Sequence, residues 1–148
     1  MGWSLRRDFA GARRAAAALS LPATFIEGSA EAIPLEDNCI DTVATTCTLC
    51  TIPAVNHALG EIRRVLRPSG RLLFVEHGLS PDDNDRRWQD WLTPAWKGIG
   101  GGCHLNRPIR TLIENAGFAI TQLETGYIPG LKSMTFLYEG RATPAGHC

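Results

Sequence analysis

The chain has 148 residues, of which 44% are hydrophobic and 20% charged, as in an ordinary globular protein. Fifteen basic residues balance fifteen acidic ones, so no global field favours binding to nucleic acid or to an anionic membrane. We expect no integral membrane segment, because no apolar run approaches the roughly 18 residues that cross a bilayer. The length fits a single domain over residues 1–148.

The five cysteines are an odd number in a chain long enough to bury a core. This usage suits a reducing compartment better than a disulfide scaffold. We therefore predict a cytoplasmic protein.

The first segment combines pairs of arginines with a run of alanines. Arg6-Arg7 followed by alanines is similar to a twin-arginine export signal, but Arg13 and Arg14 interrupt the apolar stretch. A helix accounts better for these residues, because its apolar positions share one face: Leu5, Phe9, Ala12, Ala16 and Leu19. Its basic face is then a solvated surface.

Predicted strands and helices follow one another in the middle of the chain. Residues 23–27 have the composition of a short strand, and residues 40–46 that of a strand buried in a parallel sheet. A helix follows, with Pro53 in its first turn, and it must end before Pro68. Residues 71–76 form the next strand. Strand, helix and strand with short connections predict a βαβ unit with parallel strands.

The second half begins with apolar residues at helical spacing: Trp88, Trp91, Leu92 and Trp96. Glycines between Gly98 and Gly102 end that helix. We expect Asn106 to cap a further helix, which ends at Gly117. Residues 118–128 and 134–138 read as two strands joined by a loop.

Three stretches, in this order, resemble the middle and second half of a class I S-adenosylmethionine (SAM) dependent methyltransferase: Thr24 to Pro34, Asp41 to Thr45, and Leu66 to His77. The resemblance implies a partial Rossmann-like α/β fold, with a mostly parallel sheet, flanking helices and the first two strands missing. It implies SAM as cofactor and methyl transfer to a small-molecule acceptor. The family's Gly-rich cofactor loop has no counterpart, and its ribose-binding carboxylate would fall near Trp3 or Ser4.

Ligands of open α/β sheets bind outside the carboxyl ends of the strands. The resemblance adds roles to the residues there. Gly28-Ser29-Ala30-Glu31 is similar to the loop that receives the adenine ring, and Thr45-Thr46-Cys47 to the strand end under the sulfonium and ribose. The alternative is that Ser29 and Thr45 only satisfy hydrogen bonds of turns.

Two histidines are candidates for acid–base catalysis. In such enzymes Glu76 and His77 would end the strand that faces the acceptor. A base that titrates near neutrality helps when the acceptor carries a proton, which suits His77 or His104. The alternative is a structural hydrogen bond. We expect His77→Ala to lower turnover more than SAM binding.

The stretch from Trp88 to Arg107 resembles a subgroup that includes membrane-associated alkyl-thiol methyltransferases. The matching residues are Trp88-Gln89, Pro94-Ala95-Trp96, Gly102-Cys103, Leu105 and Arg107. In that subgroup the stretch forms part of an acceptor-side lid, which implies a thiol acceptor. The subgroup's hydrophobic N-terminal anchor has no counterpart here, which argues against a membrane assignment. Alternatively, the tryptophans simply pack against the sheet.

Two further motifs compete with this interpretation. Gly98-Ile99-Gly100-Gly101-Gly102 has the spacing of a cofactor loop, but it follows a helix instead of a strand, so we interpret it as a hinge. Cys47-x-x-Cys50, with Cys103 and either His104 or His57, could supply zinc ligands or a redox pair. Since Cys47 ends a buried strand and no second C-x-x-C follows, we favour packing and predict no metal.

An incomplete sheet would leave the edge of the strand at residues 40–46 exposed. We therefore expect a homo-oligomer, a complementing chain, or insertion of the chain's own N-terminal strand. The alternative to an enzyme is a non-catalytic, methyltransferase-derived interaction module.

Overall fold

A computed structural model describes residues 6–20, 22–99 and 101–146. The expected carboxylate position at Trp3 or Ser4, and Gly100 of the glycine run, lie outside these residues. The elements in chain order are α1 (Arg6–Ala18), β1 (Ile40–Thr46), α2 (Val55–Val65), β2 (Leu66–His77), α3 (Asp83–Ile99), α4 (Ile109–Asn115), β3 (Phe118–Tyr127), the short 3₁₀ helix η1 (Lys132–Met134) and β4 (Phe136–Pro144).

The four described strands form one mixed sheet in the order β1-β2-β4-β3. β1 and β2 are parallel, as the βαβ pattern predicts, while β4 pairs antiparallel with both β2 and β3. The expectation of a mostly parallel sheet is therefore wrong for the described strands. The reason is that α2 provides a crossover between β1 and β2, whereas a short loop reverses the chain between β3 and β4.

β2 begins earlier than the sequence predicts. Ile40 pairs with Leu66, and the next partners are Thr42 and Arg71. The segment between Leu66 and the expected strand start at Arg71 is thus an irregularity inside β2. It contains Pro68, which has no N–H to donate to the ladder.

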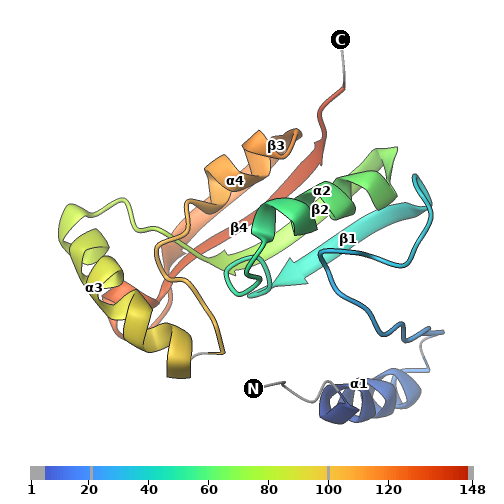
Figure 1. Cartoon of the computed structure of the whole chain (residues 1–148), viewed down its shortest axis with the longest axis horizontal. Helices are drawn as coiled ribbons and strands as arrows, with labels where there is room; N and C mark the ends of the chain where they lie inside the picture. Colours follow the sequence, from blue (N-terminus) through green and yellow to red (C-terminus); the bar gives the residue numbers. More distant parts are fainter. Residues whose placement is uncertain (1–5, 21, 100, 147–148) are drawn as a thin grey trace.

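The main core lies between one face of the sheet and the helices α2 and α4, which lie side by side on it (Figure 1). Its buried residues include Leu59, Ile62, Leu72, Phe74, Ile109, Ile113 and Phe118. The other face presents side chains such as Ala44, Thr46 and Glu139 to solvent, over a shallow depression of about 390 Å³. The amphipathic pattern of α2 thus faces the core as expected.

The N-terminal helix forms as predicted, but the strand expected at residues 23–27 does not. These residues run extended beside α1 without belonging to the sheet, and Figure 1 shows α1 apart from the strands. The Arg13 guanidinium lies 4.9 Å from the centre of the Phe25 ring, while Leu19 and Ile26 stay exposed. Strand-forming composition is not enough here, because a strand exists only where a neighbour receives its hydrogen bonds.

The second half contains two local corrections. Asn106 does not cap α4: the N-cap is Pro108, without a side-chain hydrogen bond, and Asn106 donates to Asp90 of α3 instead. Gly117 does follow the end of α4, in the left-handed conformation (φ +83°) that favours glycine. Trp88 and Trp91 do not pack against the sheet but are exposed on α3. None of the described helices is long and apolar enough to cross a membrane.

Candidate active site

The turn that follows β1 is anchored by a buried carboxylate. Glu76, near the end of β2, is fully buried and accepts hydrogen bonds from the backbone N–H groups of Thr48 (3.1 Å) and Cys50 (3.2 Å). Burial raises the pKa of Glu76, and these backbone donors partly oppose that rise. Glu76 therefore positions the turn.

The segment after α3 holds the same turn through its carbonyl groups. Arg107 donates to the carbonyl oxygens of Leu49 and Ile52, the latter at 2.7 Å. The backbone N–H of His104 donates to the carbonyl of Cys50 at 2.8 Å. Residues 47–52 are thus fixed from two sides at the carboxyl ends of β1 and β2.

The two candidate histidines have different surroundings. His104 Nδ1 lies 3.2 Å from the Cys50 carbonyl oxygen, and burial, followed by the charge of Arg107, lowers the pKa of its ring. His77 ends β2, is half-buried, and its Nδ1 lies 3.6 Å from Cys47 Sγ. Both histidines are half-buried, and the ring of His104 faces a backbone carbonyl whereas the ring of His77 faces thiols.

A cluster of sulfur atoms lies next to His77. Cys50 and Cys103 are buried with their Sγ atoms 3.5 Å apart, and the two sulfurs and a ring nitrogen of His77 all lie within 4.8 Å of one another. The thiol of Cys103 donates to the Cys50 sulfur, which lowers the pKa of Cys50 and raises that of Cys103. A second hydrophobic cluster surrounds the pair: Leu92, Trp96, Leu105 and Met134.

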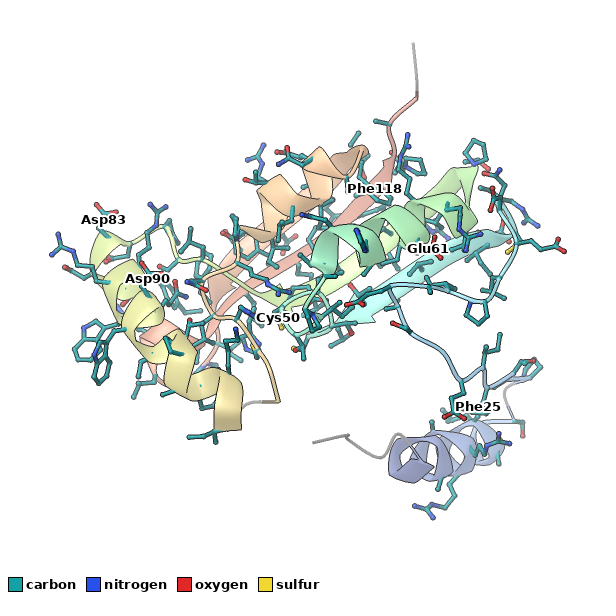
Figure 2. All side chains as sticks on the ribbon, viewed as in Figure 1. Phe25, Cys50, Glu61, Asp83, Asp90 and Phe118 are labelled. Atoms are coloured by element: carbon teal, nitrogen blue, oxygen red, sulfur yellow. The ribbon has the colours of Figure 1, made fainter. Side chains whose placement is uncertain are left out.

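The histidine that meets the sulfurs of Cys50 and Cys103 is His77, not His104 or His57, which the sequence suggested as alternatives. His57 is exposed on α2, and His104 turns its Nδ1 to a carbonyl, whereas His77 meets the sulfurs. The signal was available, because His77 ends the strand parallel to β1 and the carboxyl ends of parallel strands lie at one edge of a sheet. Cys50 is labelled in Figure 2, in the loop between β1 and α2.

The predicted adenine loop is committed to hydrogen bonds within the protein. Ser29 Oγ accepts the N–H of Glu31 at 3.1 Å, and Glu31 Oε1 accepts the N–H of Ala54 at 3.0 Å. A Cβ on Gly28 would lie 3.0 Å from the Pro34 ring, which explains a glycine there. Ala30, between Ser29 and Glu31, is half-buried. The loop is therefore fixed against the start of α2.

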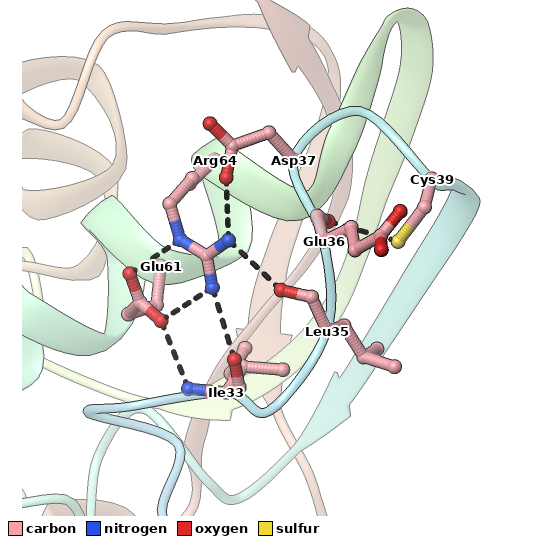
Figure 3. A network of polar contacts seen from close by, with 7 residues as sticks. All are labelled: Ile33, Leu35, Glu36, Asp37, Cys39, Glu61 and Arg64. Carbon is pink, nitrogen blue, oxygen red and sulfur yellow. Dashed lines mark hydrogen bonds and ion pairs between the residues drawn. The ribbon is translucent and has the colours of Figure 1, made fainter.

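Arg64 and Glu61 of α2 hold the chain just after this loop, as Figure 3 shows. Arg64 donates to the carbonyls of Ile33 and Leu35, each at 2.9 Å, and pairs with Asp37. Glu61 accepts hydrogen bonds from Arg64 and from the N–H of Ile33. The network joins residues 33–37 to α2.

The end of β1 offers one unused polar atom. Thr45 is 7% exposed, and its Oγ1 is the buried side-chain oxygen without a hydrogen-bond partner in the described part of the chain. Thr46 is exposed and its carbonyl accepts the Thr48 hydroxyl. A buried hydroxyl without a partner fits a site that receives a polar ligand group, such as a ribose hydroxyl of SAM.

On the other side of the turn, α3 is tied to the end of β2. The side chain of Gln89, 1% exposed, accepts the N–H of Ser80 (2.9 Å) and donates to the carbonyl of Gly78 (3.0 Å). Trp88 and Trp91 form an exposed edge-to-face pair with ring centres 5.6 Å apart. Of the three tryptophans between Trp88 and Arg107, Trp96 packs against the buried cysteines.

The comparisons with known proteins point to one family. Residues 6–74 match the family model described as a methyltransferase domain. The thiol S-methyltransferase TMT1B of Rattus norvegicus is 43% identical over 91 residues, which are 61% of this chain and 37% of that protein. The chain thus spans little more than a third of the length of this curated relative.

Solved structures agree on the fold. A proposed methyltransferase from Bacillus halodurans superposes with a TM-score of 0.71 at 15% identity, covering 91% of this chain and 78% of that one. The [4+2]-cyclase SpnF superposes with a TM-score of 0.68 at 20% identity, covering 93% of this chain and 62% of that one. Its name shows that the fold alone does not fix the reaction. The family match over residues 6–74 and the similarity to a thiol S-methyltransferase over 91 residues agree: this part of the chain is similar to SAM-dependent methyltransferases.

Proposed function

We propose that this chain binds SAM at the carboxyl ends of β1 and β2 and takes part in methyl transfer to a small-molecule thiol. The observation that carries the proposal is the 43% identity to a thiol S-methyltransferase over 91 residues.

The geometry supports a cofactor position between the end of β1 and the loop at residues 28–31. Thr45 supplies the unpartnered hydroxyl. Hydrogen bonds donated by the Ala54 N–H and by the Arg64 guanidinium hold the loop and its continuation against α2. Methyl transfer is an in-line displacement whose main need is positioning of donor and acceptor. A fixed turn at residues 47–52 meets that need.

Isothermal titration calorimetry of the purified chain with SAM and with S-adenosylhomocysteine tests the cofactor half of the proposal. We expect binding of both ligands. An assay with a small alkanethiol and labelled SAM tests the acceptor half, with an amine of equal chain length as control. Absence of binding heat by a chain that is folded by circular dichroism would support the non-catalytic interaction module instead.

A further inference from the structure

Three metal-binding side chains converge at the end of β2, and a fourth lies beside them. Cys50, Cys103 and His77 bring their ligand atoms within 4.8 Å of one another, and Cys47 Sγ lies 3.6 Å from His77 Nδ1. We propose that Cys50, Cys103 and His77 bind a zinc-type divalent cation and that Cys47 completes a tetrahedral set. The proposal replaces the packing role that the sequence suggests for these cysteines.

The spacing of the ligand atoms fits such a site. With Zn–S distances of about 2.3 Å and Zn–N distances of about 2.0–2.1 Å, tetrahedral geometry places two sulfurs about 3.8 Å apart and a sulfur about 3.6 Å from a nitrogen. The Sγ atoms of Cys50 and Cys103 are 3.5 Å apart, and the Cys47 sulfur is 3.6 Å from the His77 nitrogen. Cys50, Cys103 and His77 thus have the spacing of three ligands, and a rotation of the Cys47 side chain toward the two buried sulfurs would supply the fourth.

The backbone around the ligands is fixed before any ion arrives. Glu76 holds the N–H of Cys50, and the N–H of His104 holds the Cys50 carbonyl. Both residues that anchor Cys50 are adjacent in sequence to the other two ligands. Glu76 precedes His77, and His104 follows Cys103. Such outer contacts orient metal ligands and limit the ordering that binding requires.

The donor set selects the class of ion. Thiolate sulfur and imidazole nitrogen favour zinc and related soft cations, whereas magnesium and calcium prefer oxygen ligands. Cys50 and Cys103 are buried among Leu105, Trp96 and Leu92, while Cys47 is exposed and His77 half-buried. The ion can therefore enter from the side of Cys47 and His77, and on binding it displaces the thiol protons.

The metal assignment also bears on His77. A ring nitrogen that binds a cation has no lone pair left for a proton, so the predicted general-base role and the ligand role exclude each other at that nitrogen. Metal content is measured on the protein alone, so it decides between them independently of any methyl transfer.

Metal analysis of the chain, purified under reducing conditions with added zinc and then desalted, is the first test. We expect stoichiometric zinc in the wild-type chain and in Cys39→Ser, since Cys39 contacts the Glu36 carbonyl away from the cluster. We expect it to be lost in Cys50→Ser and in Cys103→Ser. Wild-type protein without zinc, or equal zinc in Cys39→Ser and in both cluster variants, would overturn the proposal.

Titration with Co²⁺ tests the site in the wild-type protein itself, so the result does not depend on whether a variant folds. Wild-type protein titrated with Co²⁺ should show intense visible bands of tetrahedral cobalt and sulfur-to-cobalt charge transfer, and His77→Gln, with its partly exposed side chain, should weaken binding and shift them. Glu76→Gln should weaken binding about 10–100-fold by loosening the turn. Unchanged Co²⁺ affinity in Cys47→Ala would remove Cys47 from the site. The wild-type chain could instead contain a Cys50–Cys103 disulfide. If the protein takes up no Co²⁺ after that disulfide is reduced, the proposed site is refuted.

Discussion

At the carboxyl end of β1, the Thr45 hydroxyl is buried without a hydrogen-bond partner among the described residues. A substitution that removes this oxygen tests whether it meets a ligand. Thr45→Val keeps the shape of the side chain and removes the oxygen. Because an unsatisfied buried hydroxyl costs about 1–3 kcal/mol, we expect the free energy of unfolding to rise in the absence of ligand. If SAM supplies the missing partner, the same variant should bind SAM more weakly by calorimetry.

The matched control is Thr42→Val on the same strand. Its hydroxyl is exposed and accepts a hydrogen bond from Arg71, away from the carboxyl end of β1. We expect this variant to leave SAM affinity unchanged. A Thr45→Val chain that gains stability and retains full SAM affinity would show that the hydroxyl meets no ligand.

Among the elements, α2 is joined to the preceding loop by a network whose strength depends on pH. Hydrogen bonds from Arg64, and then from the N–H of Ile33, lower the pKa of Glu61 to about 2. Because the folded-state pKa is depressed, this stabilisation is fully present above the unfolded value of about 4.3 and is lost as pH falls through about 2. We expect Glu61→Gln to lower the melting temperature at pH 7, with the difference from wild type shrinking below about pH 4.3.

Glu114→Gln provides the control for that measurement. Glu114 pairs with Arg110 within α4, and the pair is exposed, so it contributes little to stability. Thermal unfolding followed by circular dichroism at several pH values compares the two variants. A Glu61→Gln difference that stays constant down to pH 2 would contradict the assigned role of the carboxylate.

A helix or strand could be predicted from the sequence where the pattern of its own residues is sufficient to determine it. The apolar spacing of α2 and the β-branched run of β1 each correspond to the observed element. Residues 23–27 have a strand-like composition too, yet form no strand, because pairing depends on a neighbour that composition does not reveal. Asn106 failed as a cap for a related reason, since Asp90 from another helix binds its amide.

The candidate site was predictable only in part. Its position at the strand ends followed from a general rule of α/β sheets, which selected Thr45, Cys47 and His77. The meeting of Cys50 with Cys103 was only one alternative in the sequence, because these residues lie 53 positions apart in the chain and a loop after α3 brings them together. Anchors such as Arg107 and Glu76 act on backbone groups, and no sequence motif marks such contacts.

At the scale of the whole molecule, β1 is an edge strand of the described sheet. Five of its seven residues are β-branched, in the sequence IDTVATT, and such an edge is a template for pairing with another chain. β3 forms the opposite edge but is poorer in β-branched residues, in the sequence FAITQLETGY. We therefore expect copies of the chain to form a dimer through β1.

Light scattering of the purified chain over a range of concentrations tests this expectation with a matched pair of variants. Ala44→Lys and Ala119→Lys place the same charge at exposed positions on β1 and β3. Two copies paired through β1 would bring the new lysines close together, so Ala44→Lys should shift the wild-type dimer toward monomer, while Ala119→Lys should not. A wild-type chain that is monomeric at every concentration, or an equal effect of both lysines, would exclude pairing through β1. Addition of salt should partly restore the Ala44→Lys dimer, because the repulsion between exposed charges is screened.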